Sequence, residues 1–127
     1  MDTDKKQSYS ISPAGEKFAL PNETDYAIEL ARIEKLVALA RSEKKEIVVV
    51  MGLGFVGAVM AAIVADTKDA SGMNSKFVIG CQRPSSRSFW KIPMINRGEA
   101  PVKAEDPEVA ILIERCVLQD KTFVATY

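Results

Sequence analysis

The order of polar and apolar positions divides the chain into a polar start, an amphipathic stretch and an alternation of short apolar runs. Residues 1–22 are polar and interrupted by prolines and a glycine, which predicts a flexible tail. Residues 23–45 carry apolar side chains at helical spacing, with acids near the start and bases near the end. This pattern predicts an amphipathic N-terminal helix capped by Thr24 or Asp25. Its apolar stripe either packs on its own domain or binds a partner.

Residues 46–127 alternate between short apolar runs and helical patterns. The run at 47–51 is β-branched and shows no polar alternation, which is typical of a strand covered on both faces. Asp106 and Pro107 have the residue types of a helix N-cap and first turn, and Gly98 suits the end of a helix. We expect further strands at 76–80 and 121–125, and helices at 58–66, within 84–98 and at 108–117.

A strand, a helix and a second strand in this order form a βαβ unit. The sequence therefore predicts an α/β fold, with a parallel sheet that has helices on both faces and is preceded by the N-terminal helix. Right-handed crossovers place the three expected strands side by side in chain order. A small sheet with an exposed edge also favours assembly into a homo-oligomer.

The segment Gly-Leu-Gly-Phe-Val-Gly lies between the first expected strand and the helix that follows it. Gly52 permits a tight turn, Gly54 leaves room for a pyrophosphate, and Gly57 allows the helix to pack close to the strand. The backbone N–H groups of Phe55 and Val56, at the start of the helix, can donate to phosphate oxygens. This context predicts a Rossmann-type dinucleotide-binding domain over residues 46–127.

The end of the second expected strand bears on the choice of dinucleotide. An acidic residue usually binds the adenosine ribose there, but this chain has Gln82, followed by Arg83 and Arg87. A glutamine can bind a ribose hydroxyl, and arginines can bind a 2′-phosphate. Both NAD and NADP therefore remain candidates, with NAD placed first.

Three separated segments resemble the UDP-glucose/GDP-mannose dehydrogenase family, also called nucleotide-sugar dehydrogenases. The run VVVMGLGFVGAVMAA resembles the family's opening strand and turn, and INRGEAPV (95–102) resembles a segment after its second strand. Residues 107–117 and the ending FVAT (123–126) resemble its next helix and strand. The resemblance covers about residues 46–127 and leaves the first 45 outside it.

The resemblance implies an NAD-dependent oxidation of a UDP- or GDP-sugar at C6, from alcohol to carboxylate, as in polysaccharide biosynthesis. It implies that residues 52–57 hold the pyrophosphate, and that Arg87 and Thr126 lie near the cofactor. Gln82 departs from the family, which has an aspartate at this position. The family's Glu-Pro-Gly is also altered, which leaves the role of Glu105 open.

The family's catalytic cysteine and lysine lie downstream of the segments matched here, and neither Cys81 nor Cys116 corresponds to the nucleophile. We therefore expect a truncated dinucleotide-binding part that does not catalyse the oxidation alone and contains no catalytic residue. One alternative is a stand-alone nucleotide-binding or interaction module. Another is a different Rossmann oxidoreductase, of the 3-hydroxy acid or 6-phosphogluconate type.

Composition and charge limit the kinds of partner and metal that the sequence leads us to expect. The 127 residues carry 17 basic and 17 acidic side chains, so charge gives no reason to expect nucleic acid or a membrane surface as a partner. The chain has no histidine, and its two cysteines lack the spacing of a zinc site, so no metal is expected. Without a visible secretory signal, a cytoplasmic location is expected.

Overall fold

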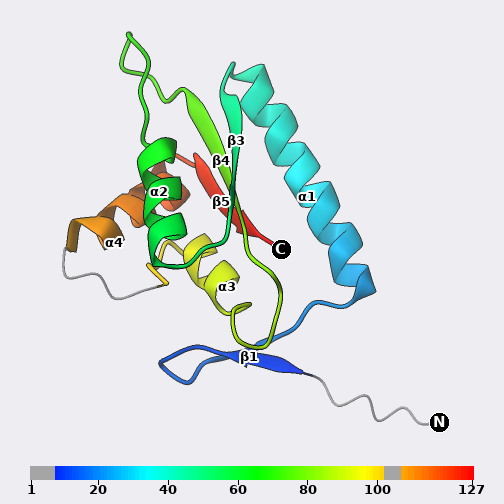
Figure 1. Ribbon diagram of the computed structural model, residues 1–127. Coiled ribbons are helices and arrows are strands. Elements are labelled where there is room, and N and C mark those ends of the chain that lie inside the picture. Colours follow the sequence, from blue (N-terminus) through cyan, green and yellow to red (C-terminus); the bar gives the residue numbers. More distant parts are fainter. Residues whose placement is uncertain (1–7, 102–106) are drawn as a thin grey trace.

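The computed structural model describes residues 8–101 and 107–127, and its centre is a parallel sheet of three strands (Figure 1). The strands are β3 (Glu46–Met51), β4 (Lys76–Cys81) and β5 (Phe123–Thr126), in the order β3-β4-β5. The predicted Rossmann-like α/β fold and strand order are confirmed. Each strand lies within two residues of its expected position.

The central strand, β4, is covered on both faces, whereas β3, for which the sequence predicted this, is an edge strand with Val49 and Met51 exposed. Val78 lies opposite Val48 on β3 and Phe123 on β5, so the strand is paired along both edges. Its residues from Phe77 to Gly80 are buried. A strand with neighbours on both edges and helices on both faces has no position that favours a polar side chain.

One face of the sheet is covered by α2 (Phe55–Ala65), α3 (Lys91–Asn96) and α4 (Pro107–Glu114), as Figure 1 shows. Helix α4 continues as a π-helical turn, η1 (Arg115–Gln119). Helix α2 turns alanines towards the core, where small side chains permit close packing on the sheet. The fully buried alanines of this helix are Ala58, Ala61, Ala62 and Ala65.

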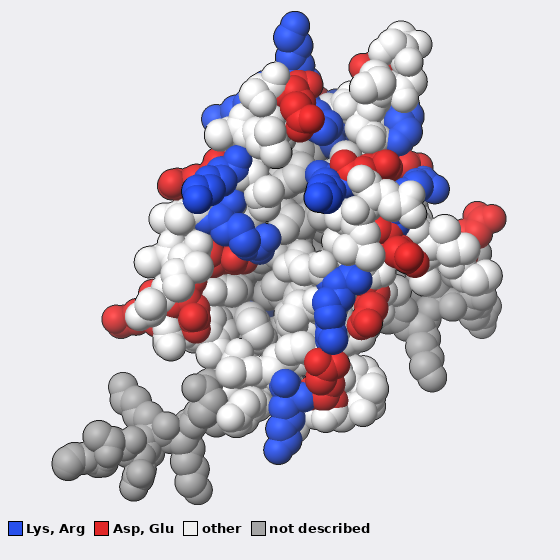
Figure 2. Space-filling model, turned by 180° about the vertical axis from the view of Figure 1, so that it is seen from behind, with Lys and Arg blue, Asp and Glu red and all other residues white. Residues whose placement is uncertain are grey.

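The opposite face is covered by α1 (Glu23–Ser42). Ala40 is buried there, and Leu36 and Val37 pack against a cluster that includes Phe77. Part of the apolar stripe therefore packs on the helix's own domain, while Ile28 and Leu39 remain exposed. Figure 2 shows basic and acidic side chains interspersed over the side of the molecule turned away in Figure 1.

The start of α1 differs from the prediction of a cap at Thr24 or Asp25. Asn22 is the N-cap, and its side chain accepts a hydrogen bond from the Asp25 N–H at 3.0 Å. The Asp25 carboxylate accepts in return from the Asn22 N–H at 2.9 Å. The acid at position 25 is thus the third helical residue of a capping box, which places the cap three residues earlier.

The flexible tail expected over residues 1–22 is wrong for residues 9–19. They form an antiparallel hairpin of β1 (Tyr9–Ile11) and β2 (Lys17–Ala19). The hydroxyl oxygen of buried Ser10 accepts a hydrogen bond from the Trp90 N–H at 3.0 Å. Each strand has only three residues, so this long-range contact helps to hold the hairpin in place.

Helix α3 protects the outer edge of β5. The Asn96 side chain donates to the Ala125 carbonyl and accepts from the Ala125 N–H, both at 2.9 Å. It therefore makes the two bonds that a further strand would make at this position. The helix ends as predicted, because Gly98 has φ +83° and the Glu99 N–H donates to the Met94 carbonyl at 3.0 Å.

Two expectations fall partly outside the described residues. The Asp106 cap and the end of the segment 95–102 lie outside the described residues. Helix α4 begins at Pro107, as predicted. In the part of the chain that is described, no helix combines the length and apolar character that crossing a membrane requires.

Replacing Asn96 by alanine should destabilise the fold. The variant leaves the buried Ala125 N–H without its acceptor and the carbonyl with only its 3.2 Å bond from Arg32, so we expect a loss of about 2 kcal/mol in the free energy of unfolding. Urea unfolding followed by circular dichroism measures the loss. Asn74→Ala, which removes only a hydrogen bond from the Lys68 ammonium at the surface, is the matched control, and an equal loss in both variants would contradict this role for Asn96.

Candidate functional site

The glycine turn begins where β3 ends and is fixed to the neighbouring strand. Gly52 has φ +89°, a conformation that side chains disfavour, and its N–H donates to the Cys81 carbonyl at 2.7 Å. The chain then reverses through Leu53, which is fully buried, and enters α2 at Phe55. The turn therefore lies at the carboxyl end of the sheet, where open α/β folds bind their ligands.

Gly57 allows α2 to approach this turn. A Cβ atom added to Gly57 would lie 1.9 Å from the Gly52 carbonyl oxygen, a distance that no side chain can adopt. The expectation that this glycine permits close packing is confirmed. Gly54 differs, because a Cβ added there meets no atom within 4 Å and its φ of −73° is ordinary. Space is therefore open beside Gly54.

The first turn of α2 offers hydrogen-bond donors. Gly54 is the N-cap and makes no side-chain cap, so the N–H groups of Phe55, Val56 and Gly57 lack the usual cap. This turn also contains no acidic residue that would neutralise the positive end of the helix dipole. Phe55 and Val56 are exposed, so solvent or a ligand can reach the turn.

Gln82 connects the end of β4 to the glycine turn. Its Oε1 atom accepts a hydrogen bond from the Leu53 N–H at 2.7 Å, and its own N–H donates to the Thr126 carbonyl at 2.9 Å. The strand end that the sequence associates with ribose binding is thus brought to the turn expected to hold the pyrophosphate. This link between residues 29 positions apart has no local sequence signal.

A cavity of about 520 Å³ opens beside this link, at the carboxyl ends of β3 and β4. Its walls come from both strand ends, the loop after β4 and the last residue of the chain. They include Met51, Gly52, Cys81, Gln82, Arg83 and Tyr127. Arg83 thus lies at the cavity, whereas Arg87 lies on the following turn, where its carbonyl accepts from Trp90 Nε1 at 2.8 Å.

Comparison with known proteins connects this geometry to a family. The crystal structure of an NDP-N-acetyl-D-galactosaminuronic acid dehydrogenase from Methanosarcina mazei Go1 matches 72% of this chain at 35% identity, with a TM-score of 0.56. The resemblance to a nucleotide-sugar dehydrogenase is confirmed. The match spans 18% of the length of that dehydrogenase. No protein-family profile and no curated protein sequence matches the chain.

The structure places Thr126, which the resemblance to nucleotide-sugar dehydrogenases sets near the cofactor, on the α1 side of the sheet. Its hydroxyl donates to the Glu29 carboxylate at 2.5 Å. Both residues line a second cavity of about 490 Å³ between α1 and the sheet. The Thr126 side chain is therefore not brought to the glycine turn, although its carbonyl accepts from the Gln82 N–H.

Glu29 is the centre of a polar group that the sequence reasoning missed. The Arg32 guanidinium donates to both of its carboxylate oxygens, at 2.7 and 2.8 Å, and to the Ala125 carbonyl at 3.2 Å. Burial opposes ionisation of Glu29, but hydrogen bonds from Arg32 and Thr126 outweigh it and lower the pKa of this carboxyl. The spacing of three residues between Glu29 and Arg32 on a helix was the available signal.

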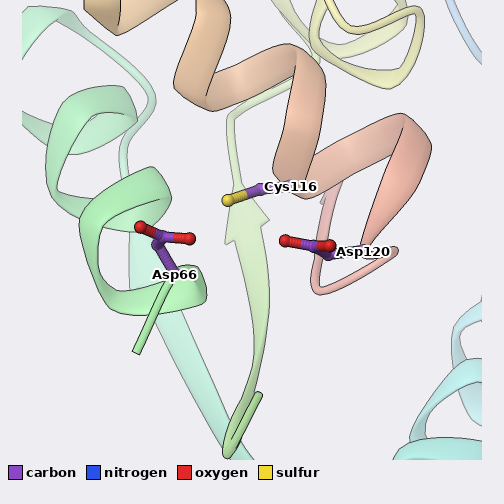
Figure 3. A group of neighbouring side chains, drawn as sticks. All are labelled: Asp66, Cys116 and Asp120. Atoms are coloured by element: carbon purple, nitrogen blue, oxygen red, sulfur yellow. The ribbon is translucent and has the colours of Figure 1, made fainter. Parts of the chain in front are cut away.

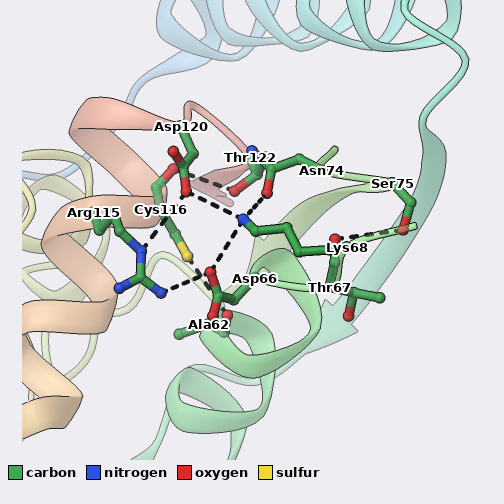
Figure 4. Close-up of polar contacts among 10 residues, drawn as sticks. All are labelled: Ala62, Asp66, Thr67, Lys68, Asn74, Ser75, Arg115, Cys116, Asp120 and Thr122. Atoms are coloured by element: carbon green, nitrogen blue, oxygen red, sulfur yellow. Dashed lines mark hydrogen bonds and ion pairs between the residues drawn. The ribbon is translucent and has the colours of Figure 1, made fainter. Parts of the chain in front are cut away.

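Asp66, Cys116 and Asp120 turn towards one another at the opposite end of the sheet (Figure 3). Their ligand atoms lie within 4.8 Å of one another, but two basic side chains already occupy this place. Arg115 lies 2.7 Å from Asp66, and Lys68 lies 3.4 Å from Asp66 and 3.8 Å from Asp120 (Figure 4). Ion pairing therefore accounts for the two carboxylates without a metal.

Both cysteines have thiols that burial makes less acidic. Desolvation raises the pKa of Cys81, and it also raises that of Cys116, which is fully buried. A raised pKa reduces the thiolate fraction that a nucleophilic cysteine needs. Neither thiol is therefore activated as a nucleophile by its surroundings.

The two glycines of the turn should respond differently to the same substitution. Gly57→Ala forces α2 away from the Gly52 carbonyl and should cost about 3 kcal/mol in the free energy of unfolding. Gly54→Ala, which meets open space, should cost less than about 1 kcal/mol, the effect of a poorer N-cap. Urea unfolding of both variants tests this, and equal losses would contradict the packing role of Gly57.

Acid should remove the stabilisation that Glu29 provides. Because the folded-state pKa is lowered, this contribution is present above the unfolded pKa of about 4.3 and disappears as pH falls through the folded value. Wild type should therefore be more stable than Glu29→Gln at pH 7, and the difference should shrink towards pH 3. Urea unfolding across this range tests it, and a difference independent of pH would contradict the assignment.

Proposed function

We propose that this chain is the dinucleotide-binding part of a nucleotide-sugar 6-dehydrogenase, with NAD or NADP as its cofactor. The observation that carries the proposal is the turn at residues 52–57, which combines open space at Gly54 with the uncapped start of α2. Similarity to the Methanosarcina mazei dehydrogenase supports the same reaction class. The substrate would be a UDP- or GDP-sugar whose C6 alcohol is oxidised to a carboxylate.

The residues of this chain fit a dinucleotide. Gly54 would leave room for the pyrophosphate, and the N–H groups of Phe55 and Val56 would donate to its oxygens. The helix dipole would add attraction for the negative charge. Gln82 and Arg83, at the adjoining cavity, would receive the adenosine ribose. When bound, the cofactor accepts a hydride from the substrate, and the role of this chain is to bind and orient it.

Chemistry on the sugar requires groups that we do not assign within residues 1–127. In the family that the sequence resembles, a cysteine and a lysine outside the matched segments perform it. The raised pKa values of Cys81 and Cys116 argue against either as a substitute. We therefore propose that the chain alone binds dinucleotide without oxidising the sugar.

The alternative of an interaction module relied on α1 as a partner helix. Ala40, Leu36 and Val37 pack on the sheet, whereas Ile28 and Leu39 of the same stripe remain exposed, so the structure supports this alternative only in part. Assembly into a homo-oligomer stays a prediction, supported by the outer edge of β3, which pairs with no strand among the described residues. A cytoplasmic location likewise stays a prediction from the sequence.

The variant Gly54→Val tests the proposed cofactor site. Its side chain would project into the space assigned to the pyrophosphate, and its Cβ would meet no atom of the fold within 4 Å. We expect isothermal titration calorimetry to detect dinucleotide binding to the wild-type chain and at least about a tenfold weaker affinity in the variant. Circular dichroism verifies that the variant is folded. Equal affinity in both proteins, or no binding to the folded wild type, would overturn the proposal.

A further inference from the structure

We infer that this site selects NADP over NAD, with Gln82 and Arg83 as the residues that recognise the 2′-phosphate of the adenosine ribose. The inference rests on the proposed dinucleotide-binding function and concerns the ribose end of the same site. Its basis is the orientation of the Gln82 amide, together with the charge of the loop that follows it.

The orientation of Gln82 is fixed by its partner. The Leu53 N–H can donate only to an acceptor, so the side-chain oxygen must face the glycine turn, at 2.7 Å from the Leu53 nitrogen. The amide Nε2 group, which carries two N–H donors, is left without a partner among the described residues. Gln82 lines the cavity at the strand ends, so these donors are available to a ligand there.

A hydrogen-bond donor at this position reverses the preference for NAD over NADP that a carboxylate gives. Discrimination in favour of NAD relies on a carboxylate that accepts hydrogen bonds from the ribose hydroxyls and repels a 2′-phosphate. The Gln82 amide cannot repel the phosphate, because it has no charge and presents N–H groups. A phosphate, with its strong acceptor oxygens, is a better partner for such donors than a hydroxyl.

The charge around the cavity also favours NADP. Arg83 lines the cavity and is exposed, and its guanidinium makes no ion pair within the described part of the chain. No residue that lines this cavity is acidic among those described. The phosphate would therefore meet a free guanidinium and no acidic side chain, which favours a charge-assisted hydrogen bond.

The loop that carries Arg83 is held by its own hydrogen bonds. The Ser88 hydroxyl donates to the Arg83 carbonyl at 2.7 Å and lies 2.7 Å from the Ser85 hydroxyl. The Ser85 N–H donates to the same carbonyl at 2.9 Å. These bonds fix the backbone at Arg83, so less conformational entropy is lost when its side chain binds a ligand.

Calorimetric titration of the 127-residue chain with NADP and NAD, and with adenosine 2′,5′-bisphosphate and AMP, tests the inference. We expect the ligand with the 2′-phosphate to bind at least about tenfold more tightly in each pair. The preference should shrink as salt is added, because the phosphate contacts are ionic.

Two variants and a control connect the preference to the named residues. Gln82→Glu keeps the oxygen that accepts from Leu53 and replaces the donors by negative charge, so it should weaken NADP binding and reverse the preference. Arg83→Ala should weaken NADP about tenfold and leave NAD nearly unchanged. Arg41→Ala, which removes the same charge at the far end of α1, should leave both affinities unaltered.

The outcomes separate this inference from the proposed function. Binding of NAD as tight as or tighter than that of NADP would overturn the inference and leave the dinucleotide site standing. An NADP preference that survives both Gln82→Glu and Arg83→Ala would overturn the assignment to these residues. If the folded wild-type chain binds neither dinucleotide, the inference and the proposed function are both wrong.

Discussion

Contact between the Gly52 carbonyl and the α-carbon of Gly57 sets the geometry of the carboxyl end of the sheet. Helix α2 starts this close to β3 only because residue 57 has no side chain. The close start lets the alanines of α2 lie flat on the sheet, where Ala58 and Ala61 are fully buried. It also fixes where the first N–H groups of the helix lie relative to the end of β3. One steric constraint thus determines both the packing of α2 and the position of its donors.

The same end of the sheet is connected across its strands by hydrogen bonds. Gly52 donates to the Cys81 carbonyl, Leu53 donates to the Gln82 side-chain oxygen, and the Gln82 N–H donates to the Thr126 carbonyl. These bonds tie the ends of β3, β4 and β5 to one another. A ligand that spans the glycine turn and the end of β4 would therefore meet an arrangement that is already formed, which lowers the entropic cost of binding.

Much of the fold could be predicted from the sequence because its signals are local. The β-branched run at 47–51, the glycine spacing and the helix end at Gly98 each depend on a few neighbouring residues. The hairpin at residues 9–19 could not be predicted, since its short strands are held by a contact between Ser10 and Trp90. The residues of the candidate site could be predicted from motifs. The hydrogen bonds between them could not, because they join positions far apart in the sequence. The side-chain direction of Thr126 likewise depends on α1, which lies outside the resemblance to the dehydrogenase family.

The most direct test of the account is a two-dimensional ¹⁵N–¹H NMR titration of the folded chain with dinucleotide, because it reports on each backbone N–H separately. The account predicts that the amide signals of Gly54, Phe55 and Val56 shift together with those of Gln82 and Arg83. Signals from the middle of α1, on the other face of the sheet, should remain in place. Shifts confined to α1 and its cavity, or no shifts at saturating dinucleotide, would contradict the claim that the glycine turn holds the phosphates.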